Sequence, residues 1–575
     1  MKNQPGQTLS GGKILLESLL EQGVDTVFGY PGGSIMPTYD DLLDYSDCMR
    51  HVLVRHEQGA IHAAQGYARS SGRTGCVIVT SGPGATNVVT GVADAMIDST
   101  PVVVIAGQVP VWQLGTDAFQ ESDVIGLMTP ISKWAYQIRR PEDVAWAVAR
   151  AFYIASSGRP GPVVLDFTKD AQVGTCIYEK AKCDFIRSYV PVPEIPEDRI
   201  QQAVEMIDAA RKPFVVYGQG VTLSGAQDAL AAFLEKGDIP AGSTMMGLSA
   251  LPTDNPRHVG MVGMHGNIAC NVLTQECDLL IAVGMRFSDR VTGEVSHYAR
   301  NAKILHIDID ASEIGKNVPV DLGIAGDARD ALTRITAAMK PGVKREDWRD
   351  CVANCYKSEE RKVISSELHS SSEGINPGEV VDLVARMGGA QALVVTDVGE
   401  NQLVAARYSR FAQPRSLITS GGLGTMGFGL PAAIGAKIAC PGRQVVLFAG
   451  DGGFQMTLQE LGTIMQEKTG VKMVILNNNW LGNVRMLQEL FCEERYSYTH
   501  LVNPDFKTLA SAYGIECVDV DCREALEPAV CRMLSDDKPF ILNVRICEDN
   551  MVFPIVPPGK SVDEMMLNKN EWYGN

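Results

Sequence analysis

Short runs rich in Val and Ile recur along the chain and alternate with segments of helical periodicity. This alternation is typical of parallel α/β sheets, because two parallel strands need a crossover connection, usually a helix, between them. The expected strands fall into three groups: residues 26–29, 51–55, 76–80, 102–106 and 163–167; residues 214–217, 279–283 and 304–309; and residues 393–396, 445–449, 471–476 and 540–544. The pattern predicts an α/β fold with three doubly wound parallel-sheet domains.

Two interruptions suggest where these domains meet. A chain of 575 residues is too long for a single core. A Pro-rich stretch at residues 180–197 is a linker candidate, and the α/β pattern fades again in the charged, serine-rich residues 340–375. We therefore expect an N-terminal domain at residues 1–185, a central domain at 190–345 and a C-terminal domain at 375–575.

Charge and composition exclude some partners. The chain has 51 Lys and Arg against 68 Asp and Glu, a net charge of −17, which disfavours binding to nucleic acid. We expect neither a signal peptide nor a membrane span, because the apolar runs are far shorter than the roughly 18 residues that a span needs. The 14 cysteines form no Cys-x-x-Cys pair, which argues against a zinc site or a redox dithiol. A cytoplasmic location is predicted.

Two consecutive strands in the third group end in polar turns, the first of which is rich in glycine. Residues 445–449 lead into Gly450-Asp451-Gly452-Gly453, with a helix expected to begin at about Thr457, and residues 471–476 lead into Asn477-Asn478. Glycines let backbone N–H groups approach a diphosphate, and the oxygens of Asp451 and Asn478 suit Mg²⁺. Two ordinary turns are the alternative, but the spacing across one strand–helix–strand unit favours a metal site.

Glu57 stands at a comparable place in the first group. Residues 51–55 end in Arg55-His56-Glu57, where a helix opens, so a ligand at the carboxyl end of the strand could reach this carboxylate. The alternative is a glutamate favoured at a helix N-terminus by the helix dipole.

Together these motifs resemble a known family. Gly450-Asp451-Gly452 followed by Asn477-Asn478 is similar to the thiamine-diphosphate fingerprint. The chain also resembles acetohydroxyacid synthases over nearly its whole length, from Tyr30-Pro31-Gly32-Gly33 to Val556-Pro557-Pro558-Gly559. The resemblance implies a pyrimidine-binding N-terminal domain, a central FAD-type domain and a diphosphate-binding C-terminal domain, with thiamine diphosphate, Mg²⁺ and FAD as cofactors.

The resemblance also implies roles for individual residues. Glu57 would hydrogen-bond the aminopyrimidine ring and promote removal of the thiazolium proton, which is the cofactor's own chemistry. Other catalytic candidates are Gly33, Phe119 and Gln120, with Lys169 and Arg290 as cations for ketoacid carboxylates. Thiamine diphosphate would contact Glu57, Asn87, Gln120, Val398, Gly399, Gly424, Met426, Gly450, Gly452, Gly453, Met456 and Asn478. The flavin would contact Arg159, Met264, His265, Gly284, Arg286, Asp308, Asp327 and Ala328. The backbone carbonyl of Trp480 would complete the metal ligands. Met426 could equally be core, and Arg290 a surface ion pair.

Several positions depart from the family pattern: Ser34, Ser288, the pair Glu400-Asn401 in place of Gln-His, residues 479–481, and Leu487 in place of Trp. The tryptophan helps relatives to select 2-ketobutyrate as second substrate. Its loss would cost about 1–3 kcal/mol of discrimination, so a weaker preference for 2-ketobutyrate is expected.

The implied activity joins two 2-ketoacids. Pyruvate would be decarboxylated and its hydroxyethyl group condensed with a second ketoacid, to give 2-acetolactate or 2-aceto-2-hydroxybutyrate for branched-chain amino acid synthesis. A homodimer or homotetramer and a separate small regulatory subunit are implied. The alternatives are a pyruvate oxidase-type flavoenzyme, an FAD-free catabolic acetolactate synthase, a glyoxylate carboligase, which lacks the catalytic glutamate, and a non-catalytic nucleotide-binding protein.

Overall fold

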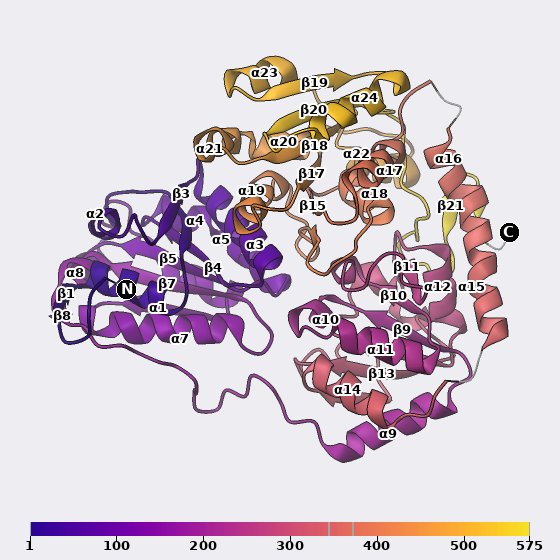
Figure 1. The fold of residues 1–575 in the computed structure, drawn as a ribbon, viewed down its shortest axis with the longest axis horizontal. Helices are drawn as coiled ribbons and strands as arrows, with labels where there is room; N and C mark the ends of the chain where they lie inside the picture. The colour runs from indigo at the N-terminus through magenta and orange to yellow at the C-terminus, as the bar shows by residue number, and fades with distance from the viewer. Residues whose placement is uncertain (1, 343–344, 371–372, 574–575) are drawn as a thin grey trace.

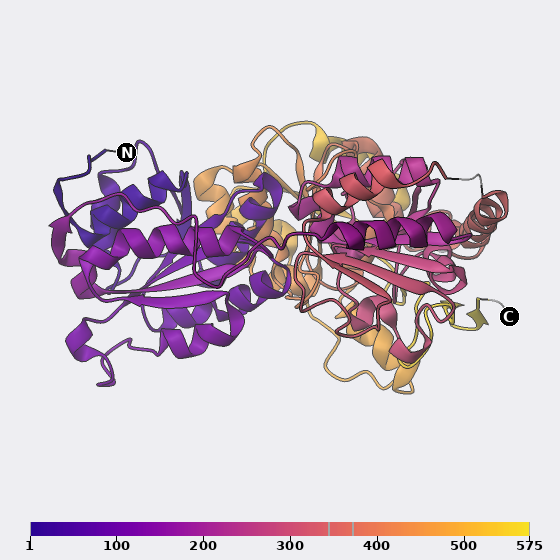
Figure 2. The ribbon, with the colours of Figure 1, turned by 90° about the horizontal axis from the view of Figure 1, so that it is seen from below.

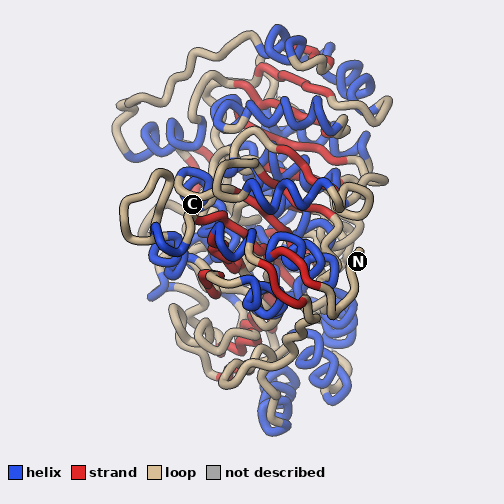
Figure 3. Tube along the Cα trace, turned by 90° about the vertical axis from the view of Figure 1, so that its left-hand side faces the viewer, coloured by secondary structure: helices blue, strands red, loops and turns tan. Residues whose placement is uncertain are grey.

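The computed structural model describes residues 2–342, 345–370 and 373–573 and contains three six-stranded sheets, all of whose strand pairs are parallel (Figure 1). Figure 3 shows helices on both sides of the strands. The predicted fold of three doubly wound domains is confirmed. In Figure 2 the N-terminal and central domains occupy opposite ends of the molecule, with the C-terminal domain behind and between them. No helix in these described ranges is long and apolar enough to cross a membrane.

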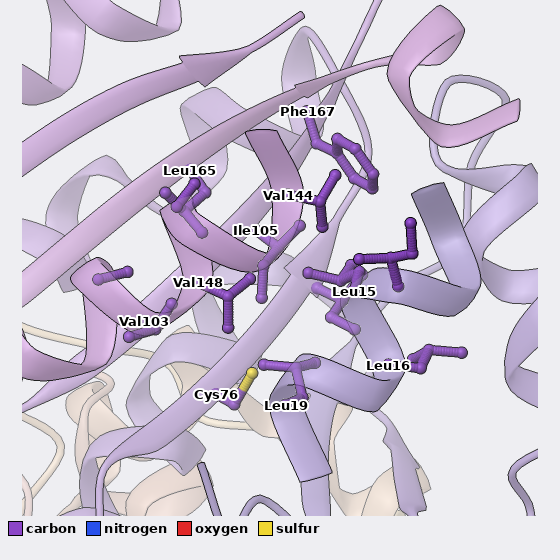
Figure 4. Packing of buried hydrophobic residues seen from close by; sticks show 14 of the residues in the cluster. Leu15, Leu16, Leu19, Cys76, Val103, Ile105, Val144, Val148, Leu165 and Phe167 are labelled. Atoms are coloured by element: carbon purple, nitrogen blue, oxygen red, sulfur yellow. The ribbon is translucent and has the colours of Figure 1, made fainter. Parts of the chain in front are cut away.

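The N-terminal sheet has its longest strands at its centre. Its spatial order is β3 (Arg50–Leu53), β2 (Thr26–Gly29), β4 (Gly75–Val79), β5 (Val102–Gln108), β7 (Pro162–Thr168) and β6 (Trp134–Ile138). Its main helices are α1 (Gly11–Glu21), α3 (Glu57–Ser71), α5 (Val89–Ile97) and α7 (Val144–Ser156). Alternate residues of a strand face opposite sides. Cys76 packs with α1 and α7 (Figure 4), as does Ile78, while Val77 and Val79 pack with α3.

The central sheet has the strand order typical of dinucleotide-binding folds. The order is β11 (His258–Met261), β10 (Ala241–Ser243), β9 (Pro213–Tyr217), β12 (Leu279–Val283), β13 (Lys303–Asp308) and β14 (Leu322–Ala325). Counted within the domain, this is 3-2-1-4-5-6, with a switch point between β9 and β12. The flanking helices include α9 (Glu197–Ala209), α11 (Gln227–Gly237), α12 (Ile268–Glu276) and α14 (Ala328–Ala338). Residues 178–196 run from the N-terminal domain to α9, where the linker was expected (Figure 1).

The C-terminal sheet repeats the strand order of the N-terminal one. It runs β16 (Leu417–Ile418), β15 (Leu393–Thr396), β17 (Val445–Gly450), β18 (Val471–Asn477), β20 (Phe540–Arg545) and β19 (Glu516–Val520). Its helices include α17 (Pro377–Gly388), α18 (Glu400–Tyr408), α19 (Gly429–Ala439), α20 (Asp451–Met456), α21 (Leu461–Glu467), α22 (Gly482–Phe491) and α24 (Arg523–Leu534).

Helices α3 and α19 join the N-terminal and C-terminal domains through small residues. A Cβ at Gly435 would lie 1.8 Å from the carbonyl oxygen of Ala63, and one at Gly66 would lie 2.0 Å from that of Ala432. Any larger side chain at these glycines would push the two helices apart.

Every predicted strand is present, but six further strands of the parallel sheets were missed: β6, β10, β11, β14, β16 and β19. All except β10 lie at sheet edges, where partial exposure weakens the apolar pattern, and β10 has only three residues.

One other prediction was wrong. The helix expected at about Thr457 begins at Asp451, because Gly450 already caps it in an extended conformation. The segment 340–375, where the pattern fades, forms α15 (Glu346–Glu359) and α16 (Ser365–Leu368), which pack through Trp348 and a buried Glu359–Arg407 ion pair. Residues 343–344 and 371–372 of this segment, and the domain ends 1 and 574–575, lie outside the described residues. The boundaries 1–185, 190–345 and 375–575 stay predictions.

Candidate active site

The glycine-rich turns of the C-terminal domain lie at a switch point. Val398 and Gly399 follow β15, and Gly450 ends the neighbouring strand β17. From β15 the chain continues to β16 on one side, and from β17 it continues to β18 on the other side. Such a switch point leaves a crevice at the carboxyl ends of the two strands, which is where doubly wound folds bind ligands.

Asp397 holds these turns together. Its buried carboxylate accepts hydrogen bonds from the backbone N–H groups of Val398 at 2.8 Å and of Gly427 and Gly429 at 3.0 Å. A Cβ at Gly453 would lie 2.3 Å from Asp397 Oδ1, so only glycine fits there. Burial raises the pKa of Asp397, and the three N–H groups oppose that rise. Sequence analysis missed this residue, although an acid directly after a strand was the available signal.

Two of the three predicted metal ligands lie at adjacent strand ends. Asp451 opens α20 after β17, and Asn478 follows β18; both are buried. Asn503 donates to Asp451 Oδ2 at 2.5 Å and to Asn477 Oδ1 at 3.0 Å, and so bridges the two turns. Burial raises the pKa of the Asp451 carboxyl. In the described part of the chain no cluster of three or more His, Cys, Asp or Glu could hold a metal, so a cation here would need amide and carbonyl oxygens beside Asp451.

Trp480 lies next to this centre. Its backbone N–H donates to Asn478 Oδ1 at 2.9 Å, and the indole stacks on the Arg485 guanidinium with the guanidinium carbon 4.7 Å from the ring centroid.

Glu400 and Asn401, two of the departures from the family pattern, complete the surroundings of Asn478. Glu400 Oε2 accepts a hydrogen bond from Asn478 Nδ2 at 3.3 Å, and Oε1 accepts one from Asn550. Burial raises the pKa of Glu400 to about 7. Asn401 is 4 % exposed, its Oδ1 has no hydrogen-bond partner, and its Nδ2 lies 3.5 Å from where a Cβ of Gly450 would be. Neither Asn503 nor Asn550 lies in a pattern that the sequence reveals.

The loop that contains Gly424 and Met426 is anchored by the N-terminal domain. Asp98, at the end of α5, accepts hydrogen bonds from the N–H groups of Gly421 at 2.9 Å and Gly422 at 2.7 Å, and Asp94 accepts one from Ser420. The loop turns at Gly424, with φ of +70°. Met426 approaches Gly452, whereas Met456 is 55 % exposed, and a Cβ at Gly427 would lie 3.1 Å from Met456 Cβ.

The N-terminal domain gathers a second set of predicted residues. Glu57 is the first residue of α3, which His56 caps, and Asn87 Nδ2 donates to Glu57 Oε2 at 2.9 Å. Gln120 lies on the adjoining loop: a Cβ at Gly82 would meet its backbone oxygen at 2.8 Å. Next to Gly33, Ser34 Oγ accepts a hydrogen bond from Ser81 at 2.8 Å. Phe119 is 88 % exposed, and Lys169 is half-buried at the start of α8 (Lys169–Val173).

A cavity of about 960 Å³ lies between the three domains. It is lined by all the predicted flavin residues: Arg159, Met264, His265, Gly284, Arg286, Asp308, Asp327 and Ala328. Val398, Gly399 and Gly424 of the diphosphate-binding set also line it. It opens beside the β9–β12 switch point of the central sheet, because Gly220 and Gly284 are part of its wall.

Several of these lining side chains already have partners. Arg159 pairs with Asp310 at 3.1 Å and Glu313 at 2.8 Å, which ties the N-terminal domain to the central one. Asp327 caps α14 by accepting hydrogen bonds from the backbone N–H groups of Arg329 and Asp330. Burial raises the pKa of Asp308 to about 6 and lowers that of His265 to about 4.

Arg290 and Leu487 both line the same cavity and are partly exposed. The Arg290 side chain is 70 % exposed, and its Nη1 lies 3.6 Å from Met264 Sδ. Leu487, on α22, is 40 % exposed and lines the cavity beside Met486. An exposed guanidinium next to apolar side chains can bind a small apolar carboxylate.

The two halves of the predicted site are not joined within one chain. Between described residues, no hydrogen bond or ion pair links Glu57, Phe119 or Lys169 to Asp451, Asn478 or Trp480, and none of these six residues lines the cavity.

Comparison with known proteins identifies the three domains. Residues 9–127 match the thiamine pyrophosphate enzyme N-terminal TPP binding domain, residues 200–335 match the central domain of these enzymes, and residues 397–544 match their C-terminal TPP binding domain.

Full-length relatives agree. The chain is 42 % identical to the acetolactate synthase large subunit of Lactococcus lactis, over 97 % of this chain and 96 % of the relative. It is 43 % identical to the acetolactate synthase isozyme 2 large subunit of Escherichia coli, over 97 % and 99 %. A probable acetolactate synthase large subunit of Methanocaldococcus jannaschii is 42 % identical, over 96 % and 94 %. The chain therefore belongs to the family of acetolactate synthase large subunits, within the thiamine pyrophosphate enzymes.

Proposed function

We propose that this chain is the catalytic subunit of a biosynthetic acetohydroxyacid synthase. It would decarboxylate pyruvate and transfer the hydroxyethyl group to a second pyruvate or to 2-ketobutyrate, giving 2-acetolactate or 2-aceto-2-hydroxybutyrate for branched-chain amino acid synthesis. The observation that carries the proposal is the set of strand-end groups expected for this chemistry: Glu57 with Asn87 in one domain, and Asp451 with Asn478 in another.

The residues fit the implied cofactors. Mg²⁺ would be held by Asp451, Asn478 and the backbone carbonyl of Trp480, because this cation favours oxygen ligands and is usually bound by protein and phosphate oxygens together. Gly450, Gly452 and Gly453, at the N-terminus of α20, would hold the diphosphate. Asn401 lies beside the same turn; its Nδ2 donates to the backbone oxygen of Val398, and its Oδ1 has no hydrogen-bond partner. Bound thiamine diphosphate supplies a carbon nucleophile and an electron sink. The cavity with the dinucleotide-type strand order beside it would hold FAD.

The side chains of this protein would then bind, orient and protonate. Glu57, with Oε2 engaged by Asn87, keeps Oε1 available to exchange a proton with the aminopyrimidine. Arg290 would bind the carboxylate of the second ketoacid, with Leu487 and Met486 around its alkyl group. The N-terminal domain would line the other side of the site with Gly33, Phe119, Gln120 and Lys169.

This arrangement needs two copies of the chain. Glu57 and Asp451 do not meet within one chain. Phe119 and Trp112, in the segment after β5, are 88 % and 74 % exposed, as expected for a surface that a second copy covers. A homodimer, alone or within a tetramer, would bring the two halves together. The relatives are named large subunits, so we also propose a separate small regulatory subunit. The cytoplasmic location stays a prediction.

Product analysis tests the activity. Purified protein is incubated under air with pyruvate, thiamine diphosphate, Mg²⁺ and FAD, and acetolactate is measured as acetoin after acid decarboxylation. Acetolactate is the expected product. Acetate with hydrogen peroxide would instead identify a pyruvate oxidase, and acetolactate formed at full rate by protein without FAD would identify the catabolic type.

A further inference from the structure

Glu400 lies between the candidate metal ligand Asn478 and the C-terminal segment. It is 8 % exposed at the start of α18, and its two carboxylate oxygens accept hydrogen bonds from two different amides, Asn478 Nδ2 at 3.3 Å and Asn550 Nδ2. The start of α22 closes against this pair: a Cβ at Gly482 would lie 2.7 Å from Glu400 Oε2 and 2.9 Å from Asn478 Nδ2.

The chemistry of these groups determines which way the Asn478 amide points. A carboxylate accepts hydrogen bonds at both oxygens, whereas a primary amide has one accepting and one donating end. Glu400 therefore receives the NH₂ end of Asn478, and the oxygen end is turned to the other side. There Oδ1 accepts the Trp480 N–H at 2.9 Å and keeps a second lone pair for a cation.

We infer that Glu400 is a positioning residue of the metal centre, which holds the amide of Asn478 so that its oxygen faces the cation, while Asn550 holds Glu400. The inference rests on the proposed metal role of Asn478 and deepens it. A glutamine, the residue that the family pattern has here, presents an NH₂ group to one of its two neighbours and no longer dictates the orientation of Asn478. In this chain Glu400 therefore orients the metal ligand Asn478, as residues that hydrogen-bond to metal ligands commonly do.

The test measures binding of Mg²⁺. Full-length protein is stripped of metal, saturated with thiamine diphosphate and titrated with MgCl₂ in a calorimeter. Glu400→Gln is expected to weaken Mg²⁺ binding about tenfold or more. Glu460→Gln is the matched control, because Glu460 is also buried and accepts hydrogen bonds from the backbone N–H of Arg55 and from Thr463, not from Asn478. The control is expected to bind Mg²⁺ as the wild type does.

A double variant separates positioning from general damage. In Glu400→Gln with Asn550→Asp, the new carboxylate accepts the NH₂ of Gln at position 400, which returns the glutamine oxygen to Asn478. The net charge equals that of the wild type. The double variant is expected to recover most of the lost Mg²⁺ affinity, whereas Asn550→Asp alone sets two carboxylates against each other and is expected to weaken binding.

The outcomes distinguish a failure of this inference from a failure of the proposed metal site. Unchanged Mg²⁺ affinity in Glu400→Gln, or no recovery in the double variant, would overturn the positioning role. If Glu400→Gln fails to fold, Asn550→Asp and the double variant still decide, because a loss of affinity in Asn550→Asp that the double variant reverses requires that the orientation of Asn478 matters. Wild-type protein that binds no Mg²⁺ in the presence of thiamine diphosphate would instead overturn the proposed metal site itself.

Discussion

Asn87 Nδ2 donates a 2.9 Å hydrogen bond to Glu57 Oε2, so the residue that ends one helix holds the carboxylate that begins another. The two helices follow β4 and β3, the strands that pair with β2 on its two sides, which is why residues 30 positions apart meet at the carboxyl edge of the sheet. One carboxylate oxygen is thereby fixed and the other remains available to a ligand.

Glu57→Gln is expected to lower kcat for acetolactate formation about 10²–10⁴-fold, because an amide cannot exchange the proton that the aminopyrimidine needs. Asn87→Ala keeps the carboxylate and loses only its orientation, so its loss should be smaller. Steady-state kinetics at saturating thiamine diphosphate measures both. Wild-type turnover in Glu57→Gln would remove Glu57 from the mechanism.

Gly453→Ala is expected to destabilise the C-terminal domain by about 1–3 kcal/mol and to weaken binding of thiamine diphosphate, because the new methyl group would lie 2.3 Å from Asp397 Oδ1. Thermal unfolding and a cofactor titration measure these effects. Gly442→Ala is the control, since a Cβ there has nothing within 4 Å. Equal stability of the two variants would contradict the packing argument.

Leu487→Trp is expected to raise the preference for 2-ketobutyrate over pyruvate as second substrate by about 1–3 kcal/mol, roughly 10-fold to 200-fold, because an aromatic ring adds an apolar wall beside Arg290. Competition between the two ketoacids measures the product ratio. Val484→Trp, on the same helix but outside the cavity lining, should leave the ratio unchanged. A ratio that moves equally in both variants would show that the cavity position of Leu487 is irrelevant.

Asp166→Asn is expected to change how stability depends on pH. Burial raises the pKa of Asp166 to about 7; the nearby Asp123 adds to the rise, while hydrogen bonds from Gln137 and Gln108 and the charge of Arg139 oppose it. The folded protein therefore holds this proton more tightly than the unfolded chain, whose aspartate ionises near 3.8. Stability falls as pH rises from about 4 to about 7 and the loss is complete above that, up to about 4 kcal/mol for this group.

Asparagine removes this penalty and can place its NH₂ at the Oδ1 position, which has no hydrogen-bond partner. The variant should therefore gain thermal stability relative to the wild type at pH 8, and gain less or nothing at pH 5. The same difference in unfolding midpoint at both pH values would show that the proton at Asp166 is not linked to folding.

The sequence by itself determined the three sheets and their strand-end motifs. Central strands are buried on both faces, so they read as continuous apolar runs, and a polar turn after such a run must lie at the carboxyl edge of the sheet. That is why Asp451 and Asn478 could be located in advance, whereas Glu57 follows the edge strand β3, which is only partly buried. Edge strands such as β6 and β19 are partly exposed and lack this signal.

Only the tertiary structure decided what these groups touch. The partners of Glu400 lie 78 and 150 positions away, and Ser420 reaches Asp94 across 326 positions. No local pattern encodes such pairs, because they depend on how helices and loops from separate sheets pack together. Arg159 shows the same limit: the family resemblance predicts a flavin contact for it, and the packing of two domains pairs it with Asp310 and Glu313.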